Sequence, residues 1–172
     1  MEVIRLDGPT YVPYFFSQAL AAVESLTDTA KKHKIDEMYE GYKRHFPGVH
    51  DFSARQILQM IDRKKVIFVD IRKTKEQAVS MISGAITEME FMQSHSTYRG
   101  YIVVGYCTIG SRSGRLARKL KKKGINMFNM RGGLLAWLHA GGIVHQDGKP
   151  VNRVHVYGRK WDLVPADVKS VW

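Results

Sequence analysis

Cysteine is almost absent from this sequence: there is one in 172 residues, Cys107, so no intramolecular disulfide can form. Long apolar runs are absent too, and none approaches the roughly 20 residues that span a bilayer as a helix. The N-terminal stretch lacks the basic start and apolar core of a secretion signal. These absences lead us to expect a protein of the reducing cytoplasm with no membrane partner.

Acidic residues are scarce: 16 Asp and Glu stand against 27 Lys and Arg, which gives a formal net charge of +11. Such an excess attracts anions, whether small oxyanions, acidic proteins or nucleic acid. The densest basic stretch, residues 115–123, is interpreted as the solvated face of a helix, because no zinc finger, homeodomain or aromatic RNA-binding motif accompanies it. Nucleic-acid binding is therefore a minor hypothesis, and it predicts a strong salt dependence.

The middle of the chain alternates between strand and helix patterns. Val66–Val69 and Tyr101–Tyr106 are continuous apolar runs rich in β-branched residues, which is typical of strands buried on both faces. Residues 125–130 give a weaker third strand. Helix patterns fall near residues 53–61, 75–81, 88–94, 113–123 and 134–140. This alternation predicts an α/β domain with a central parallel sheet, helices on both faces and reactive groups just beyond the carboxyl ends of the strands.

Residues 1–48 are expected to form an N-terminal helical extension. A helix pattern runs over residues 14–47, with a second short helix predicted over Asp36–Arg44 and a boundary at Pro47-Gly48. Too many aromatic residues fall here for a free tail, which favours packing on the sheet domain or a homodimer contact through the N-terminal helices. These aromatic residues are Tyr11, Tyr14, Phe15, Phe16, Tyr39 and Tyr42.

Residues 146–172 are expected to be a C-terminal tail that docks on the domain, because Trp161, Leu163 and Trp172 favour burial over free movement. Docking close to a reactive group would restrict large reaction partners, but the sequence leaves the place of docking open. The predicted division of the chain is thus an extension at 1–48, a domain at 49–145 and a tail at 146–172.

Cys107 directly follows the second apolar run, and a short glycine-containing loop separates it from an amphipathic helix. A loop of this kind can point several backbone N–H groups at one spot, and the positive end of the helix reinforces them. A thiolate is stabilised there, and Arg112 adds a fixed positive charge. A free cysteine can also be only a small core residue, but that reading leaves Gly110, Ser111 and Arg112 unexplained. The pattern therefore favours a nucleophilic sulfur.

The segment Cys107-x-x-Gly110-x-Arg112-Ser113 resembles the active-site loop of rhodanese-like sulfurtransferases. Other segments resemble that family in the same order along the chain, over residues 49–145. They are Ser53–Leu58, Val69–Arg72 with Glu76, Gly84–Ile86 and Gly132–Trp137. The resemblance implies a rhodanese-like three-layer fold. One departure is the stretch Ser80–Ala85, which lacks the histidine and proline usual in the family and so leaves its local conformation in doubt.

The resemblance also implies a function. The Cys107 thiolate would take sulfane sulfur from a small anion such as thiosulfate, or from a persulfide donor, and pass it to cyanide, a thiol or a protein. No metal or organic cofactor is required, and the seven histidines show no metal-ligand spacing. The implied substrate-binding residues are Thr108, Ile109, Gly110, Ser111 and Ser113 beside Cys107 and Arg112. Asp70, Arg72 and Arg131 are expected to support the site, with Glu76 as the partner of Arg72.

Two other functions fit the same segment. One is a sulfur-carrier or interaction module with little activity on free thiosulfate, although the intact Cys107 and Arg112 argue against an inert domain. The other is a phosphatase or arsenate reductase, in which five residues between the cysteine and the arginine make a cradle wide enough for phosphate. Four residues separate Cys107 from Arg112 here, which favours sulfur over phosphate.

Overall fold

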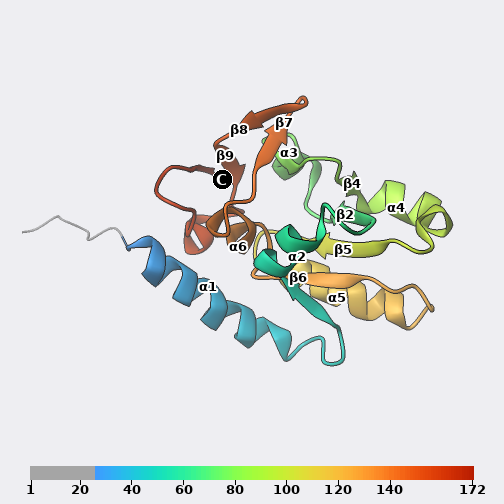
Figure 1. Ribbon diagram of the computed structural model, residues 1–172. Helices are drawn as coiled ribbons and strands as arrows, with labels where there is room; N and C mark the ends of the chain where they lie inside the picture. The colour runs from blue at the N-terminus through green and yellow to red at the C-terminus, as the bar shows by residue number, and fades with distance from the viewer. Residues whose placement is uncertain (1–25) are drawn as a thin grey trace, which may run out of the picture.

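The computed structural model describes residues 26–172 and has a five-stranded parallel sheet at its centre (Figure 1). The strand order is β1-β6-β5-β2-β4, and every neighbouring pair is parallel. The α/β fold with a central parallel sheet is therefore confirmed. Its strands are β1 (Asp51–Ser53), β2 (Val66–Asp70), β4 (Ile86–Thr87), β5 (Ile102–Tyr106) and β6 (Phe128–Arg131).

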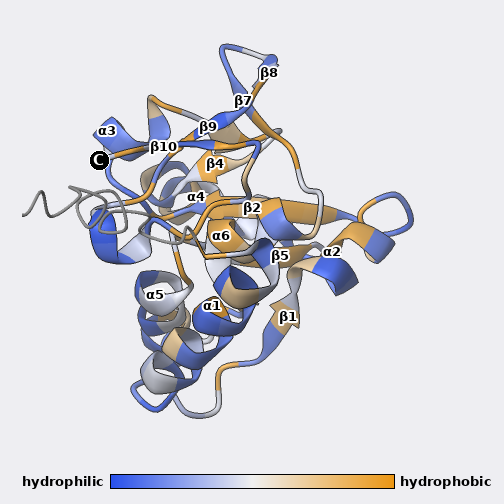
Figure 2. Ribbon diagram, turned by 90° about the vertical axis from the view of Figure 1, so that its left-hand side faces the viewer, coloured by the Kyte–Doolittle hydropathy of each residue, from blue (hydrophilic) through white to orange (hydrophobic). Residues whose placement is uncertain are grey.

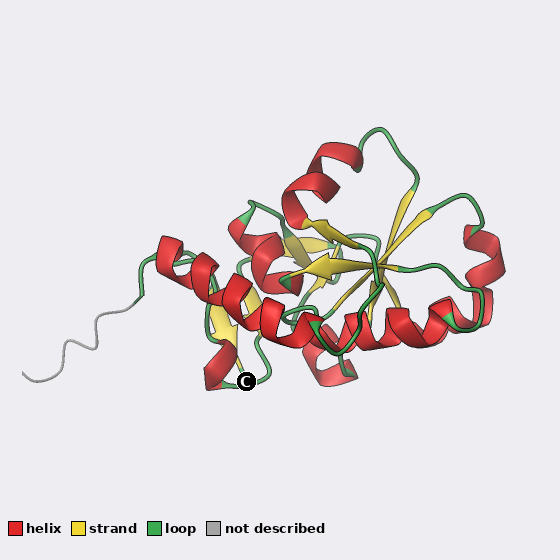
Figure 3. Ribbon diagram, turned by 90° about the horizontal axis from the view of Figure 1, so that it is seen from below, coloured by secondary structure: helices red, strands yellow, loops and turns green. Residues whose placement is uncertain are grey.

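Helices cover both faces of this sheet (Figure 3). Successive residues of a strand point to opposite faces, and the core divides accordingly. Phe68 and Val104 pack with α2 and α6 in one cluster, whereas Val69 and Val103 pack with α4 and α5 in another. Both central runs thus contribute to the core on both sides of the sheet, and Figure 2 shows the hydrophobic colour of the central strands. The helices are α1 (Asp28–Lys43), α2 (Ala54–Met60), α3 (Thr74–Gln77), α4 (Glu88–Ser94), α5 (Ser111–Lys121) and α6 (Gly133–His139).

Helix α1 corrects the prediction of two helices in the N-terminal extension. It runs without a break from Asp28 to Lys43 (Figure 1), and the Thr27 hydroxyl caps its first turn by accepting the N–H of Ala30 at 3.2 Å. The lysines and histidine at residues 31–34 interrupt the apolar pattern, but polar side chains on a solvated face do not end a helix. The part of the predicted helical pattern before residue 26 lies outside the described residues.

Helix α1 contacts both α5 and α6, which lie in different layers. Ile35 and Tyr39 are the buried residues of this helix, at 2% and 0% exposed. Ile35 belongs to the cluster around α2 and α6, and Tyr39 to the cluster around α4 and α5. The helix therefore bridges the two layers of the domain instead of standing apart from it.

The segment after β2 differs from prediction. The helix expected over residues 75–81 is only one turn, α3, and Met81–Ile82 forms β3 in a small antiparallel sheet with β7 (Val144–Gln146) and β8 (Lys149–Val151). Ser80 is fully buried, and its carbonyl accepts a 2.5 Å hydrogen bond from Arg72. This bond to a buried cation holds the chain in an extended conformation where local propensity favours a helix.

The C-terminal residues pack against the domain. Two short strands, β9 (Arg153–His155) and β10 (Lys169–Val171), pair in parallel, and a 3₁₀ turn, η2 (Arg159–Trp161), lies between them. A second 3₁₀ turn, η1 (His95–Tyr98), follows α4. The tail side chains that join the core around α2 and α6 are Val154, Val156, Leu163 and Val164. No helix within residues 26–172 has both the length and the apolar content that crossing a membrane demands.

Candidate active site

Cys107 lies directly beyond the carboxyl end of β5 and is 1% exposed. The backbone N–H of Gly110 donates a hydrogen bond to its Sγ at 3.2 Å. Gly110 has φ +87°, and a Cβ there would lie 2.7 Å from the carbonyl oxygen of Met130 and 2.8 Å from the Tyr39 ring. Only glycine fits this position. Helix α5 begins at the next residue, so its first turn, whose N–H groups have no partner within the helix, directly follows the cysteine loop.

Helix α6 fixes the loop from the other side. The N–H groups of Leu134 and Leu135 donate to the carbonyl oxygens of Cys107 and Thr108, at 2.8 and 3.1 Å. Gly133 permits this approach: it has φ +56°, and a Cβ there would lie 2.4 Å from the Cys107 oxygen. The turn at residues 131–133 therefore lies beside the cysteine loop and holds it.

Asn129 is a further support that the sequence did not single out. It is fully buried in β6, and its Nδ2 donates to the Gly110 carbonyl at 3.1 Å and to the Tyr39 hydroxyl at 2.8 Å. One side chain thus links the loop, the sheet and α1. An asparagine inside an apolar strand was the available signal, since buried polar groups need hydrogen-bond partners.

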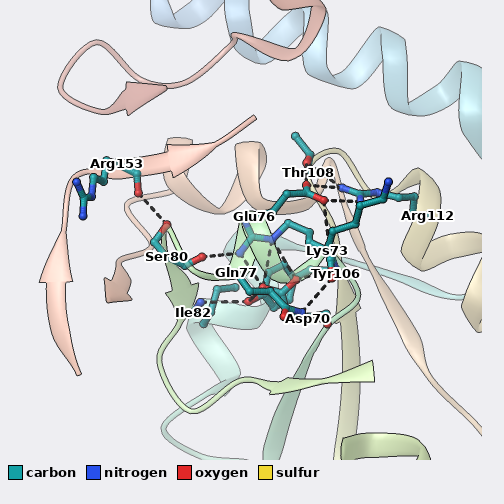
Figure 4. Close-up of polar contacts among 11 residues, drawn as sticks. Asp70, Lys73, Glu76, Gln77, Ser80, Ile82, Tyr106, Thr108, Arg112 and Arg153 are labelled. Carbon is teal, nitrogen blue, oxygen red and sulfur yellow. Dashed lines mark hydrogen bonds and ion pairs between the residues drawn. The ribbon is translucent and has the colours of Figure 1, made fainter. Parts of the chain in front are cut away.

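Arg112 forms its main ion pair with Glu76 (Figure 4). Its Nη1 and Nη2 each lie 2.7 Å from a Glu76 carboxylate oxygen, and Nη2 also donates to the Thr108 hydroxyl at 3.2 Å. Burial raises the pKa of Glu76, but the hydrogen bonds from Arg112 and the Lys73 N–H outweigh it, so the net pKa lies below the ordinary value. The predicted pairing of Glu76 with Arg72 is wrong: that arginine is taken by Asp70.

Asp70, Arg72 and Tyr106 form a second buried network, of which Figure 4 labels Asp70 and Tyr106. The Asp70 Oδ2 accepts from Arg72 Nη2 and from the Tyr106 hydroxyl, both at 2.7 Å. The same hydroxyl accepts the N–H of Ile82 at 3.2 Å, which ties β3 to the sheet. Burial raises the pKa of Tyr106 well above its ordinary value, and the Asp70 charge adds to that rise. Neither Asp70 nor Arg72 lines the pocket of Cys107; they join the elements that surround it.

Cys107 opens into a pocket of about 150 Å³. Three aromatic side chains that sequence reasoning did not assign to the site form much of its wall: Tyr42 comes from α1, and Tyr157 and Trp161 come from the tail. The aromatic excess of both flanking segments was a signal for docking, but it did not show where. The full lining is Tyr42, Cys107, Thr108, Ile109, Ser111, Arg112, Tyr157 and Trp161.

Two of the predicted site residues lie elsewhere. Ser113 is fully buried in α5 and does not line the pocket. Arg131 pairs with Asp36 and Glu40 on α1, where it stacks over the Tyr39 ring at 5.2 Å. Its place in the structure is an anchor for α1.

Comparisons with known proteins agree with this geometry. Residues 53–140, about half of the chain, match the sequence profile of the rhodanese-like domain. No curated protein sequence matches the chain.

Three solved structures share the fold. A thiosulfate sulfurtransferase from Pseudomonas aeruginosa is 20% identical with a TM-score of 0.50, and the match covers 72% of this chain and 24% of that one. A protein of unknown function, possible tyrosine phosphatase, from Rhodopseudomonas palustris is 20% identical with a TM-score of 0.50. That match covers 64% of this chain and 93% of the other. A rhodanese-like domain from Anabaena is 17% identical, also with a TM-score of 0.50. The match covers 57% of this chain and 80% of that domain. At these identities the likeness concerns the fold.

Proposed function

The chain belongs to the family of rhodanese-like domains, and from this premise we propose that it is a sulfurtransferase that carries sulfane sulfur on Cys107. One observation carries the proposal. The sole thiol lines a pocket at the carboxyl end of a parallel strand, and its Sγ accepts the Gly110 N–H directly before the N-terminus of α5. Such a site stabilises negative charge on sulfur, both on the thiolate and on the persulfide formed from it.

In the first step, the Cys107 thiolate attacks the outer sulfur of thiosulfate or another sulfane donor. The Sγ–S bond forms as the S–S bond of the donor breaks, and the electron pair leaves with sulfite or the equivalent group. The new terminal sulfur is negatively charged and accepts hydrogen bonds from N–H groups of the loop and the first turn of α5. Arg112 braces the loop through Thr108, and Glu76 holds the guanidinium in place.

In the second step, a thiophilic acceptor attacks the terminal sulfur. Cyanide leaves as thiocyanate, a thiol leaves as a persulfide, and the Sγ–S bond returns its electron pair to Cys107. No redox change occurs on the protein over the cycle, so no oxidant or reductant is consumed. The four-residue spacing between Cys107 and Arg112 makes the cradle narrower than the one that phosphate needs.

Intact-mass spectrometry tests the proposal. Wild-type protein is incubated with thiosulfate, desalted and weighed, beside Cys107→Ser. We expect a gain of one sulfur atom that cyanide removes with release of thiocyanate, and no gain in the variant. If thiosulfate fails but a protein persulfide loads Cys107, the chain is a sulfur carrier. If no donor loads it, sulfur transfer by this chain is refuted.

A further inference from the structure

The walls of the Cys107 pocket point to a class of substrate. Resting on the sulfur transfer proposed above, we infer that the preferred donor is a small organic sulfane with an apolar or aromatic group and a single negative charge, such as a thiosulfonate. The dianion thiosulfate is then the poorer donor. The inference rests on three features of the pocket: its aromatic wall, its charge and its size.

The aromatic wall comes from outside the segment that matches the family profile, which spans residues 53–140. Tyr42 lies on α1, and Tyr157 and Trp161 lie in the tail. The Tyr157 and Trp161 rings meet edge to face, with centroids 5.3 Å apart and planes at 81°. Paired rings at a pocket make favourable contacts with an aromatic or alkyl group of a donor. Thiosulfate has no such group and gains no comparable contact from the rings.

The Tyr157 ring is held in place by its surroundings. The backbone of Tyr157 has φ +71°, a left-handed conformation that residues other than glycine seldom adopt. Its N–H donates to His155 Nδ1 at 3.0 Å, and its ring packs under the Arg112 guanidinium at 4.9 Å. Unfavourable backbone conformations persist where the surrounding structure imposes them, and they concentrate at binding sites. The ring is therefore positioned at the pocket and is not an incidental surface tyrosine.

The charge of the pocket is balanced. Among the described residues that line the pocket, Arg112 alone is formally charged, and both of its terminal nitrogens bond to the buried carboxylate of Glu76. The nearby Arg72 is likewise neutralised by Asp70. A dianion entering this pocket loses hydration without meeting an unpaired cation, and the cost of removing an ion from water rises steeply with its charge. The backbone N–H groups of the loop can then stabilise one negative charge on the bound donor, but not two.

The size of the pocket limits the organic group. A volume of about 150 Å³ corresponds to roughly five water molecules, well below the cavities of drug-sized ligands. Cys107 itself is 1% exposed, so a folded donor protein cannot place its own cysteine against Sγ without a slender projecting segment. A phenyl or short alkyl group beside the sulfane sulfur fits these limits.

The transfer from such a donor is balanced. The Cys107 thiolate attacks the terminal sulfur of R–SO₂–S⁻, the Sγ–S bond forms, and the S–S bond of the donor breaks. The electron pair leaves with the sulfinate, R–SO₂⁻, and the persulfide remains on Cys107. Cyanide then regenerates the thiolate and leaves as thiocyanate, so no other reactant is involved.

Steady-state thiocyanate formation with three donors tests the inference: thiosulfate, methanethiosulfonate and benzenethiosulfonate. We expect kcat/KM to rise in that order, with benzenethiosulfonate about tenfold better than thiosulfate. Trp161→Ala in the tail and Tyr42→Leu on α1 are each expected to remove most of that preference by raising KM for benzenethiosulfonate. The quantity compared is the ratio of kcat/KM for benzenethiosulfonate to kcat/KM for thiosulfate within each variant, so a loss shared by all donors cancels. Trp172→Ala is the matched control, since this exposed tryptophan lies outside the pocket lining.

The outcomes separate this inference from the function beneath it. If Cys107 gains sulfur from all three donors but thiosulfate is equal or better, the substrate class is wrong and sulfur transfer stands. The same holds if the wall variants slow all donors equally, because a general loss indicates a damaged loop. If no donor adds sulfur to Cys107 by intact mass, both proposals fail together.

Discussion

Asp70–Arg72 and Glu76–Arg112 are chemically alike, and their carboxylates lie close in the chain: Asp70 ends β2, and Glu76 lies in α3, the short helix that follows. They differ in what surrounds the arginine. In the first pair both side chains are 0% exposed; in the second, Glu76 is 0% exposed while Arg112 is 32% exposed and lines the pocket. A fully enclosed ion pair can only hold elements together, whereas a half-enclosed one presents a fixed, neutralised guanidinium to a ligand. Asp70–Arg72 thus supports the fold, whereas Glu76–Arg112 contacts the ligand.

The largest expected effect is on the enclosed pair. Arg72→Met removes the partner of Asp70 and leaves a buried carboxylate unpaired, so we expect the free energy of unfolding to fall by about 3–5 kcal/mol. Urea denaturation followed by circular dichroism measures it. Arg115→Met is the control, because this arginine lies on the exposed face of α5 and its loss should change stability by less than about 0.5 kcal/mol. Equal stabilities of the two variants would contradict the structural role of the enclosed pair.

The second prediction concerns the pair at the pocket. Arg112→Met is expected to cost about 1–3 kcal/mol of stability, less than Arg72→Met because its side chain is partly solvated. It also leaves the Glu76 carboxylate facing the anionic persulfide, so kcat/KM in thiocyanate formation should fall about tenfold to hundredfold.

Arg112→Lys sharpens this test, because a lysine keeps the charge but cannot make the two-fold contact with Glu76. We expect an intermediate activity with near-normal stability. Arg112→Met could instead prove as unstable as Arg72→Met while its folded fraction keeps full activity. That result would show that the Glu76–Arg112 pair supports the fold and does not contact the ligand.

The same contrast shows which features sequence patterns could predict. The strands over Val66–Asp70 and Ile102–Tyr106, the helix over Glu88–Ser94 and the loop at Cys107 are local patterns of a few residues, and the structure has them where the sequence places them. A glycine-containing loop between a buried strand and an amphipathic helix also carries its own anion site in its backbone. These features depend little on distant parts of the chain.

Long-range contacts could not be predicted in the same way. Glu76 was predicted to pair with Arg72, but Arg72 forms its ion pair with Asp70 instead. The true partner, Arg112, is 36 residues away and is brought near by the pairing of β2 with β5. The aromatic wall is a stronger case, since Tyr42 lines the same pocket as Tyr157 and Trp161, which lie more than 100 positions further along the chain.

The smallest expected effect is a pH dependence that singles out Glu76. Its folded-state pKa lies below the ordinary value of 4.5, so the pair stabilises the protein fully above that pH and loses this contribution as the pH falls through the lowered pKa. Wild type should therefore exceed Glu76→Gln in stability at pH 7, and the two should converge under acid conditions. Urea unfolding between pH 7 and pH 3 measures the difference.

Glu88→Gln supplies the baseline for this comparison, since Glu88 is an exposed glutamate at the start of α4 and changes the same chemical group. The stability difference between wild type and Glu88→Gln is measured at each pH and subtracted from that of Glu76→Gln. If the remaining difference for Glu76→Gln does not change with pH, Arg112 does not favour the ionised carboxylate in the folded protein. The guanidinium would then carry a free charge at the pocket, and the preference for singly charged donors would lose its electrostatic basis.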